Sequence, residues 1–468
     1  METDLSFLHE KDKDYFYKEV DYSGSDITGL SEAVIERISR ENNDPRWLRD
    51  LRYAAYEAWQ KMDMPGEWTP EELNRLDFNN LSYFTSITDQ ENEEWGGLTA
   101  PVRETFEQLG VREEQETLLG GLKAQFDSSV VFSSLNDRLK SEGIIFVDSV
   151  TGLRDYPELF RDAFGSLIAY DSNRLAALNT AVFSGGAFLY IPPGVQVGMP
   201  LKSYFRINKE ACGQFGRTLI MLGEDSKLVF MEGCSSADHT ESSLHNSVGE
   251  IIAHKNANLQ YITFQNWARN TYNLVQMRSK AAEGAHVKWL DCNVGSKLTM
   301  KYPTTILDGA CARSEIISIG FAASGQCQDT GGKMIHRAEN TRSSIVSKSI
   351  SVGDGHASYR GLVDIPTGVS HCMNNTECDA LLINTNSRTD TYPAITVSGN
   401  ENAVQHEASV SKISADQIFY MTQRGLPEDE AVSLGVNGFI NDLVREFPVE
   451  YSASLRHLID LEMEGSVG

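Results

Sequence analysis

The chain has 468 residues, enough for two or three domains with a sizeable core, and its 41% hydrophobic and 23% charged residues are typical of a globular protein. Its formal net charge of −25 argues against a general affinity for nucleic acid or anionic membranes, because both repel an acidic surface. No window approaches the ~18 apolar residues of a membrane span, and the acidic start lacks the order of a secretory signal, so we expect a cytoplasmic protein.

Residues 1–184 are predicted to form a mainly helical N-terminal domain. Leu30, Val34, Ile35 and Ile38 recur at the spacing of one helical face. Further helix starts and stops follow along this region, each marked by proline, acidic residues or glycine.

Residues 185–411 change to short β-rich runs, each preceded by a small turn signal. The turns recur at a loose period of roughly 30 residues with no long helix between them, which indicates the coils of a β-solenoid. An antiparallel sandwich is the alternative, but its turns should recur every ~8–12 residues. The predicted strands are Leu228–Met231, Leu259–Phe264, Val287–Leu290, Ile316–Ile319, Ile345–Ile350 and Val404–Val410.

Residues 412–468 are predicted to be helical again. Ser414 and Gln417 form a capping box, Pro427 opens a second helix, and a last helix follows Pro448. So short a unit has little core of its own, so we expect it to pack against another surface.

The seven cysteines fit the cytoplasm, because they are odd in number and all lie from Cys212 onward, and they include no CxxC pair. Neither a zinc ribbon nor a thioredoxin-type dithiol is available at local spacing. Any metal chemistry would therefore use ligands that the fold brings together.

Nine short segments carry a family resemblance: Tyr204–Asn208, Met231–Cys234, Gln265–Trp267, Lys333–His336, Ser347–Ser351, Tyr359–Val363, Glu377–Asp379, His406–Ala408 and Gln423–Gly425. Together they resemble the SufB members of the SufB/SufD family, which assembles iron–sulfur clusters in the SUF system, and the resemblance runs over nearly the whole chain. SufD shares the fold, but the QNW and QRG segments and the surroundings of Cys378 look like SufB.

This resemblance implies a mainly β protein, with a right-handed parallel β-helix core (185–411) between helical N-terminal (1–184) and C-terminal (412–468) domains. It implies a scaffold rather than an enzyme, which receives persulfide sulfur and iron and releases the finished cluster to acceptors. The chain has no Walker A motif, so ATP hydrolysis would belong to a partner.

The implied partners are SufC, an ABC-type ATPase held by the C-terminal domain, and SufD or a second SufB held through the β-helix. A cysteine desulfurase or sulfur-transfer protein would supply sulfur. The family is also associated with reduced flavin, but no GxGxxG follows a strand, so no flavin-binding residues are assigned.

Cys378 matches the family's cluster cysteine, and Glu407 matches its acidic partner. Iron–sulfur clusters need thiolates, and a carboxylate can serve as a weaker ligand. In residues 403–411 the apolar side chains share one face with His406, so Glu407 should point outward if that face is internal. His406 is then either a hydrogen-bonded core histidine or part of the cluster site.

Cys234 resembles the cysteine that receives sulfur and passes it towards the cluster site. Arg206, Asn208, Gln265 and Trp267 match positions that line the internal route, where cationic or amide groups would favour a persulfide anion. Alternatively, Cys234 is a small buried hydrophobe and the other four residues serve internal hydrogen bonding and packing.

Two residues depart from the family pattern. Gln405 replaces a frequent glutamate, and Met277 before Arg278 replaces the lysine of a Lys-Arg pair.

A polysaccharide-acting β-helix enzyme and a pure interaction module that positions the ATPase remain as alternatives. Visible absorption of the anaerobically purified protein separates the scaffold, which carries a chromophore, from the interaction module.

Overall fold

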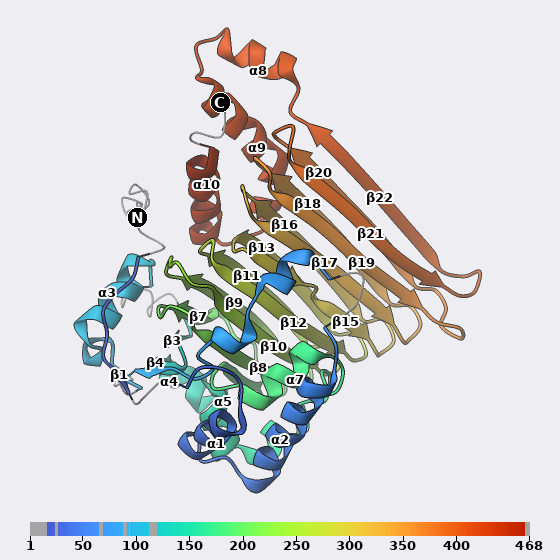
Figure 1. Cartoon of the computed structure of the whole chain (residues 1–468). Helices are drawn as coiled ribbons and strands as arrows, with labels where there is room; N and C mark the ends of the chain where they lie inside the picture. The colour runs from blue at the N-terminus through green and yellow to red at the C-terminus, as the bar shows by residue number, and fades with distance from the viewer. Residues whose placement is uncertain are drawn as a thin grey trace.

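The computed structural model describes residues 16–23, 27–64, 69–87, 91–92, 94–111 and 119–463. Its centre is a parallel β-helix built from two ten-stranded sheets, and successive coils contribute one strand to each sheet (Figure 1). Neighbouring strands are parallel except at the N-terminal end, where β3–β4 and β5–β6 pair antiparallel. The structure thus confirms the predicted parallel β-helix between helical terminal segments and rules out the antiparallel sandwich.

The first sheet contains β5 (Ile145–Asp148), β6 (Ala187–Ile191), β8 (Gly213–Leu222), β10 (Ser243–Ala253), β12 (Thr271–Ala281), β14 (Leu298–Lys301), β15 (Thr304–Leu307), β17 (Cys327–His336), β19 (His356–Ile365) and β21 (Arg388–Val397). The second sheet contains β4 (Ser129–Leu135), β3 (Gly121–Phe126), β7 (Leu201–Ile207), β9 (Lys227–Ser236), β11 (Asn258–Trp267), β13 (His286–Gly295), β16 (Arg313–Ala322), β18 (Arg342–Ser351), β20 (Met373–Leu382) and β22 (Ala403–Lys412). All six strands predicted from the turn period lie in this second sheet.

The space between the sheets holds an apolar core made by alternate residues of each strand. Leu228, Leu259 and Val287 illustrate its order, because the register stacks them in adjacent coils of the second sheet. The same alternation sends Met231, Ile262 and other residues of these strands to the outer face.

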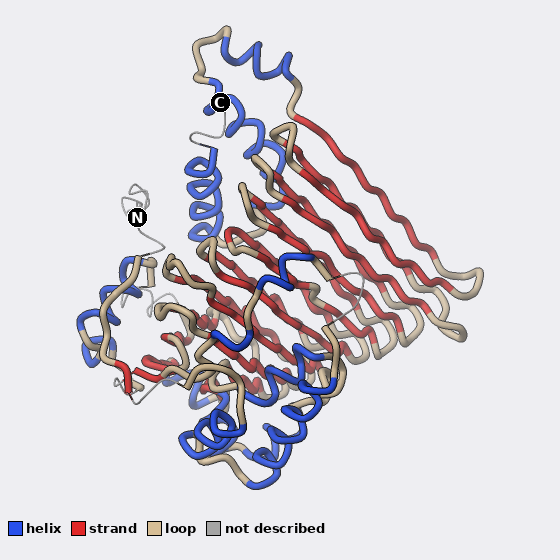
Figure 2. The backbone as a smooth tube through the Cα atoms, viewed as in Figure 1, coloured by secondary structure: helices blue, strands red, loops and turns tan. Residues whose placement is uncertain are grey.

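Most helices of the N-terminal region cover the outer face of the first sheet (Figure 2), whereas the helix Ala100–Gln108 packs against β3 and β4 of the second sheet. The predicted apolar stripe lies on α1, where Val34, Ile35 and Ile38 are buried. These helices and short elements are α1 (Glu32–Glu41), α2 (Arg46–Lys61), α3 (Ala100–Gln108), α4 (Asp137–Ser141), α5 (Ser149–Asp155), α6 (Pro157–Ala163), α7 (Arg174–Val182), the 3-10 turns Glu71–Arg75, Phe78–Asn80 and Trp95–Gly97, and the strand pair β1 (Tyr22–Ser23) and β2 (Ser86–Ile87).

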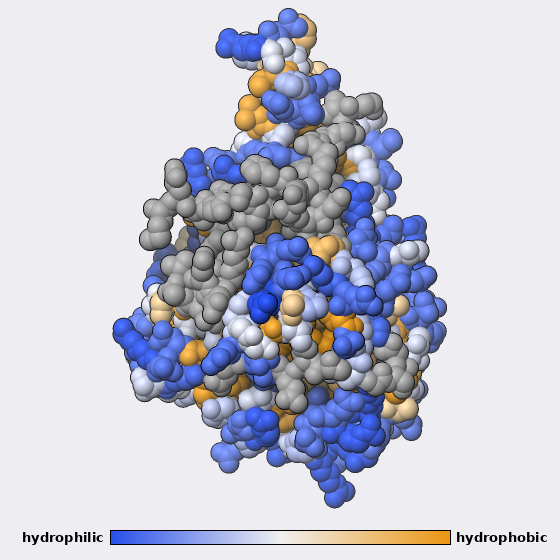
Figure 3. Space-filling view, turned by 90° about the vertical axis from the view of Figure 1, so that its left-hand side faces the viewer, coloured by the Kyte–Doolittle hydropathy of each residue, from blue (hydrophilic) through white to orange (hydrophobic). Residues whose placement is uncertain are grey.

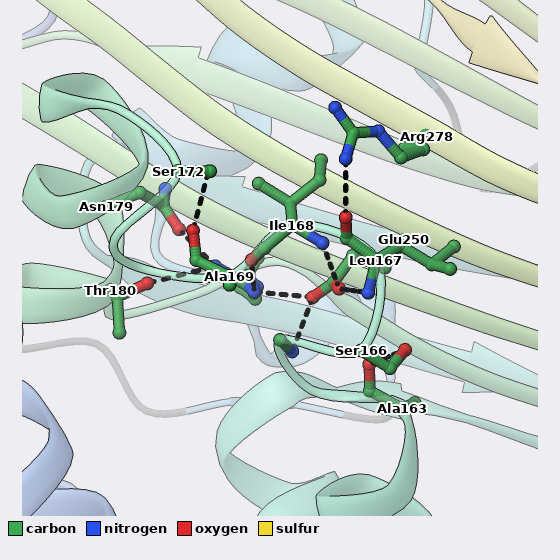
Figure 4. Close-up of polar contacts among 12 residues, drawn as sticks. Ala163, Ser166, Leu167, Ile168, Ala169, Ser172, Asn179, Thr180, Glu250 and Arg278 are labelled. Carbon is green, nitrogen blue, oxygen red and sulfur yellow. Dashed lines mark hydrogen bonds and ion pairs between the residues drawn. The ribbon is translucent and has the colours of Figure 1, made fainter.

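The buried carboxylate of Glu250 on β10 anchors this helical layer to the sheet (Figure 4). It accepts hydrogen bonds from the backbone N–H groups of Gly165, Leu167 and Ile168 and forms an ion pair with buried Arg217. Because each buried charge has its partners, the α6–α7 connection is fixed in place.

Three C-terminal helices follow β22: α8 (Ala415–Thr422), α9 (Glu428–Val444) and α10 (Val449–Met463). As the short unit led us to expect, α9 and α10 pack on another surface, the outer face of the second sheet, where Val436 and Leu455 join the cluster of Ile262 and Leu290. Helix α8 projects beyond the strands (Figures 1 and 2). No helix among the described residues is both long and apolar enough to cross a membrane.

Candidate functional site

A row of mostly polar side chains runs along the inner face of the second sheet and ends at Cys378. Strand register stacks one residue from each of six successive strands, about 24 Å from end to end at ~4.8 Å for each of the five steps. The row is Glu232, Thr263, Asp291, Ser318, Ser347 and Cys378. Of these, the sequence analysis identified only Cys378; the recurrence of polar residues at about one coil length was the available signal.

Cys234 lies beside the other end of this row, in the adjacent stack, and is 1% exposed. The Gln265 side-chain N–H donates to Cys234 Sγ at 3.2 Å, and the Trp267 indole N–H donates to Gln265 Oε1 at 2.8 Å. Trp267 also packs in one small cluster with Cys234 and Phe205. The structure therefore brings together three of the predicted residues, Cys234, Gln265 and Trp267.

Three buried charges surround the start of the row. Lys301 Nζ lies 2.6 Å from Asp291 Oδ1 and donates to Thr263 Oγ1 at 2.7 Å. Glu232 lies on the same row and accepts the hydroxyl of Tyr261 at 2.8 Å. Burial raises the pKa of Glu232, and Lys301 opposes that rise. Lys301, which the sequence analysis did not identify, is thus the cation of this internal network.

The Cys234 thiol is held neutral by its surroundings. Burial raises its pKa well above the ordinary value and Glu232 adds to the rise, while Lys301 and the Gln265 hydrogen bond oppose it. A thiolate is the reactive form of cysteine. Any change that admits water would therefore lower the pKa of Cys234 and favour its reaction.

Arg206 and Asn208 lie outside this interior. Arg206 lies between the inward residues Phe205 and Ile207 on β7, so its side chain points to the outer face, where it donates to Ser235 Oγ at 3.1 Å. The Asn208 amide accepts from Lys18 N at 3.1 Å and donates to Lys18 O at 2.8 Å. Arg206 also donates to the carbonyl of Phe16, so both predicted residues hold the segment 16–23.

Cys378 lies on β20, one strand from the end of the solenoid, and is 5% exposed. Its Sγ is 3.4 Å from His406 Nε2, so the structure brings these two predicted residues together. Burial, followed by the charges of Asp379 and Glu377, raises the pKa of Cys378 to about 11. Metal binding would displace the thiol proton, because cysteine ligates metals as thiolate.

Glu407 points to the opposite face of the sheet. Register pairs Cys378 with Ala408 and Glu377 with Glu407, and alternate residues face opposite sides. The structure therefore shows Glu407 exposed and His406 directed inward, as the alternation predicted. Within the described ranges, no group of three or more His, Cys, Asp or Glu residues is arranged to hold a metal ion.

The two departures from the family pattern lie on opposite faces of the solenoid wall. Met277 is buried inside the solenoid, and its thioether fills the space above Gly249. Arg278 points outward and donates to the carbonyl of Leu167 at 2.7 Å (Figure 4). Gln405 is exposed on the same face as Glu407.

The solenoid end next to Cys378 carries no cap among the described residues. The terminal strands β21 and β22 each pair on one side only, and apolar residues from both are exposed. Ile395 is 46% exposed and Val410 57%, although both lie on the inward-facing side of their strands. An open sheet edge with an apolar face is a ready surface for another chain.

Residues 205–439 match the family described as "SUF system FeS cluster assembly, SufBD core domain". A protein of Staphylococcus epidermidis named "Iron-sulfur cluster assembly SufBD family protein" is 42% identical over 461 residues, covering 98% of this chain and 97% of that protein. A Staphylococcus aureus protein of the same family is 42% identical over 440 residues, 94% of either chain. The chain therefore belongs to the SufB/SufD family of the SUF iron–sulfur cluster assembly system.

Proposed function

We propose that this chain is a SufB-type scaffold on which iron–sulfur clusters are built from persulfide sulfur and iron. Its family already implies a role in iron–sulfur cluster assembly as an assembly subunit. The observation that carries the finer role is the internal polar row, which joins the surroundings of Cys234 to Cys378 without leaving the solenoid.

Cys234 is the sulfur acceptor in this proposal. Its thiolate attacks the terminal sulfur of a donor persulfide; a new S–S bond forms at Cys234, the donor's S–S bond breaks, and the donor leaves as a thiolate. Gln265 and Lys301 stabilise the thiolate form, since both lower the pKa of Cys234. The hydroxyl groups of Thr263, Ser318 and Ser347 along the row then offer hydrogen bonds to sulfur on its way to Cys378. A cysteine desulfurase or a sulfur-transfer protein would be the donor.

The cluster, as cargo, is assembled at the open end. Cys378 would supply a thiolate and His406 an imidazole from the inner face, while Glu407, on the outer face, would supply a carboxylate to the same cluster only after the edge strand β22 rearranges. Such a ligand set is weak, which suits a cluster that must leave. The exposed strands β21 and β22 suit a neighbouring β-helix, either SufD or a second copy of this chain, which would complete the set.

Release is controlled through the C-terminal helices in this proposal. Phe419 and Tyr420 on α8 are 64% and 58% exposed, and the projection at the top of Figure 3 shows hydrophobic patches among hydrophilic residues. Exposed aromatic side chains are common anchors in protein interfaces. The partner would be the ATPase SufC. The family description names cluster assembly and no flavin, so the proposal includes none.

The decisive experiment is anaerobic purification followed by visible spectroscopy. The scaffold should carry an iron–sulfur chromophore, in cells or after reconstitution with iron and sulfide, and Cys378→Ser should lose it. A protein that stays colourless after reconstitution would favour the interaction module. The polysaccharide-acting alternative does not fit the family assignment.

A further inference from the structure

A pocket of about 820 Å³ opens at the edge of the solenoid next to Cys234. One wall is the segment 16–23, here called the strap, which contributes Tyr17 and Tyr22. The other walls are two turns, represented by Lys209 and His239, which join β7 to β8 and β9 to β10.

The inner sides of the same two turns close the compartment of Cys234. Cys234 lies two residues before the end of β9, and Cys212 directly follows the pocket residue Ala211. Cys212 and Cys234 belong to one buried cluster with Ile207 and Trp267. The pocket and the acceptor cysteine therefore lie on opposite sides of one thin layer of turns.

The strap is held over these turns by polar contacts, and its Val20 and Tyr22 also pack against the apolar cluster around Phe132. The Asn208 amide bonds both backbone groups of Lys18, and the Tyr22 hydroxyl donates to the buried carboxylate of Asp127 at 3.2 Å. The Tyr17 ring packs edge-on against His239, with ring centroids 5.4 Å apart. The polar contacts can be exchanged for contacts to water or to a partner, while the apolar contacts of Val20 and Tyr22 would be lost on opening.

The charges that line the pocket favour a ligand carried by a protein loop over a free ion. Lys209 stands over the Tyr22 ring at 4.5 Å, but Glu210 and Glu241 also line the walls. Mixed charge of this kind does not select a small anion from solution, whereas aromatic walls suit an inserted loop. The volume fits the tip of such a loop rather than a domain.

We infer that this pocket is where sulfur enters: it receives the persulfide-bearing loop of a donor protein, and the strap moves aside together with the two turns that it binds, which exposes Cys234. The inference rests on the proposed function of Cys234. The transfer is an exchange without net oxidation, because the donor's S–S bond breaks as the bond to Cys234 forms and the donor departs as thiolate. Opening also admits water, which favours the thiolate of Cys234.

The first test measures access to Cys234 in the full chain by alkylation with iodoacetamide and peptide mass spectrometry. Asn208→Ala, which frees the strap from its amide clamp, should speed labelling of Cys234 about tenfold or more. Tyr22→Phe should give a smaller increase. Cys292 is the internal control, because it is also 1% exposed but lies under the C-terminal helices.

The second test locks the strap by a disulfide between the turn and the strap in the double variant Tyr17→Cys, His239→Cys. Loading of Cys234 from the small-molecule probe cysteine persulfide should slow about tenfold when oxidised and recover after reduction and desalting. Unchanged labelling in both strap variants, equal increases at Cys292, or unimpaired loading of the locked protein would overturn the inference. Cluster formation that persists in Cys234→Ser would instead refute the proposed function, whatever the strap does.

Discussion

The two cysteines of the proposed route lie in opposite surroundings at two ends of one internal row. Cys234 lies under closed turns and the strap, with buried Glu232 and Lys301 nearby. Cys378 lies one strand from an edge whose inner face, at Val410, is open to solvent. The same coil geometry thus gives a sealed compartment where capping elements cover it and an open one where none of the described residues does.

Under the proposed function, this difference would let a single solenoid divide two tasks. A reactive sulfur intermediate benefits from exclusion of water, and the sealed end supplies that. A cluster that must be handed on benefits from accessible, incomplete ligation, and the open end supplies that.

The largest expected effect is on stability at the sealed end. Lys301→Met leaves the Asp291 carboxylate buried without its cation, which should cost about 3–5 kcal/mol in free energy of unfolding. His406→Ala at the open end removes a half-buried group and should cost about 1 kcal/mol. Urea denaturation gives the free energy of unfolding of each variant, so the two losses can be compared. Similar losses would mean that the two ends are equally sealed.

The next prediction concerns the projecting helix α8. Phe419→Ala combined with Tyr420→Ala should weaken binding of the SufC-type ATPase by about tenfold or more, as for hot-spot residues. The melting temperature should hardly change, because both side chains are exposed. Val449→Ala is the matched control, since Val449 is 71% exposed on α10. Titration calorimetry measures the affinity of each variant for the ATPase. If the double variant keeps full affinity, the ATPase binds elsewhere on the chain.

A smaller effect is expected at the edge strand. Glu407→Ala should reduce the fraction of reconstituted cluster that survives gel filtration while leaving the melting temperature nearly unchanged, because Glu407 is exposed. Gln405→Ala changes the same strand and the same face and should retain its cluster like the wild type. If both variants lose cluster equally, Glu407 is not a ligand, and the edge strand serves only as a contact surface for a partner chain.

The smallest effect concerns pH at the strap. Burial raises the pKa of Asp127 to about 6, and hydrogen bonds from Asn208 N and Tyr22 oppose that rise. A carboxyl whose pKa is higher in the folded state than in the unfolded chain binds its proton better when folded, so its contribution to stability falls as pH rises from about 4 to 6. Asp127→Asn should flatten the stability profile in that window. If the difference in free energy of unfolding between variant and wild type stays constant across this pH window, Asp127 does not have a raised pKa.

The sequence predicted the second sheet well because its strands follow regular turn signals. Glu283-Gly284-Ala285, for example, directly precedes β13, and Gly284 has the positive φ of +66° that such a turn requires. Strands of the first sheet lacked this signal. Strand β8 is buried at every position and shows no alternation, so periodicity could not assign it.

The functional residues were predictable only in part. Cys234 and Cys378 came from resemblance, since free cysteines give no pattern of their own. Lys301 could not be identified, because its contact with Asp291 joins strands of different sheets. The outward direction of Arg206 depends on which residues of β7 face the core, and β7 is buried on both sides.

The order in which sulfur reaches the two cysteines tests the central claim most directly. The whole SUF system would be supplied with isotopically labelled cysteine, and persulfide at each cysteine of this chain followed over time by mass spectrometry. The proposal predicts that label reaches Cys234 first, accumulates there in Cys378→Ser, and never reaches Cys378 in Cys234→Ser. Loading of Cys378 at the wild-type rate in Cys234→Ser would contradict it.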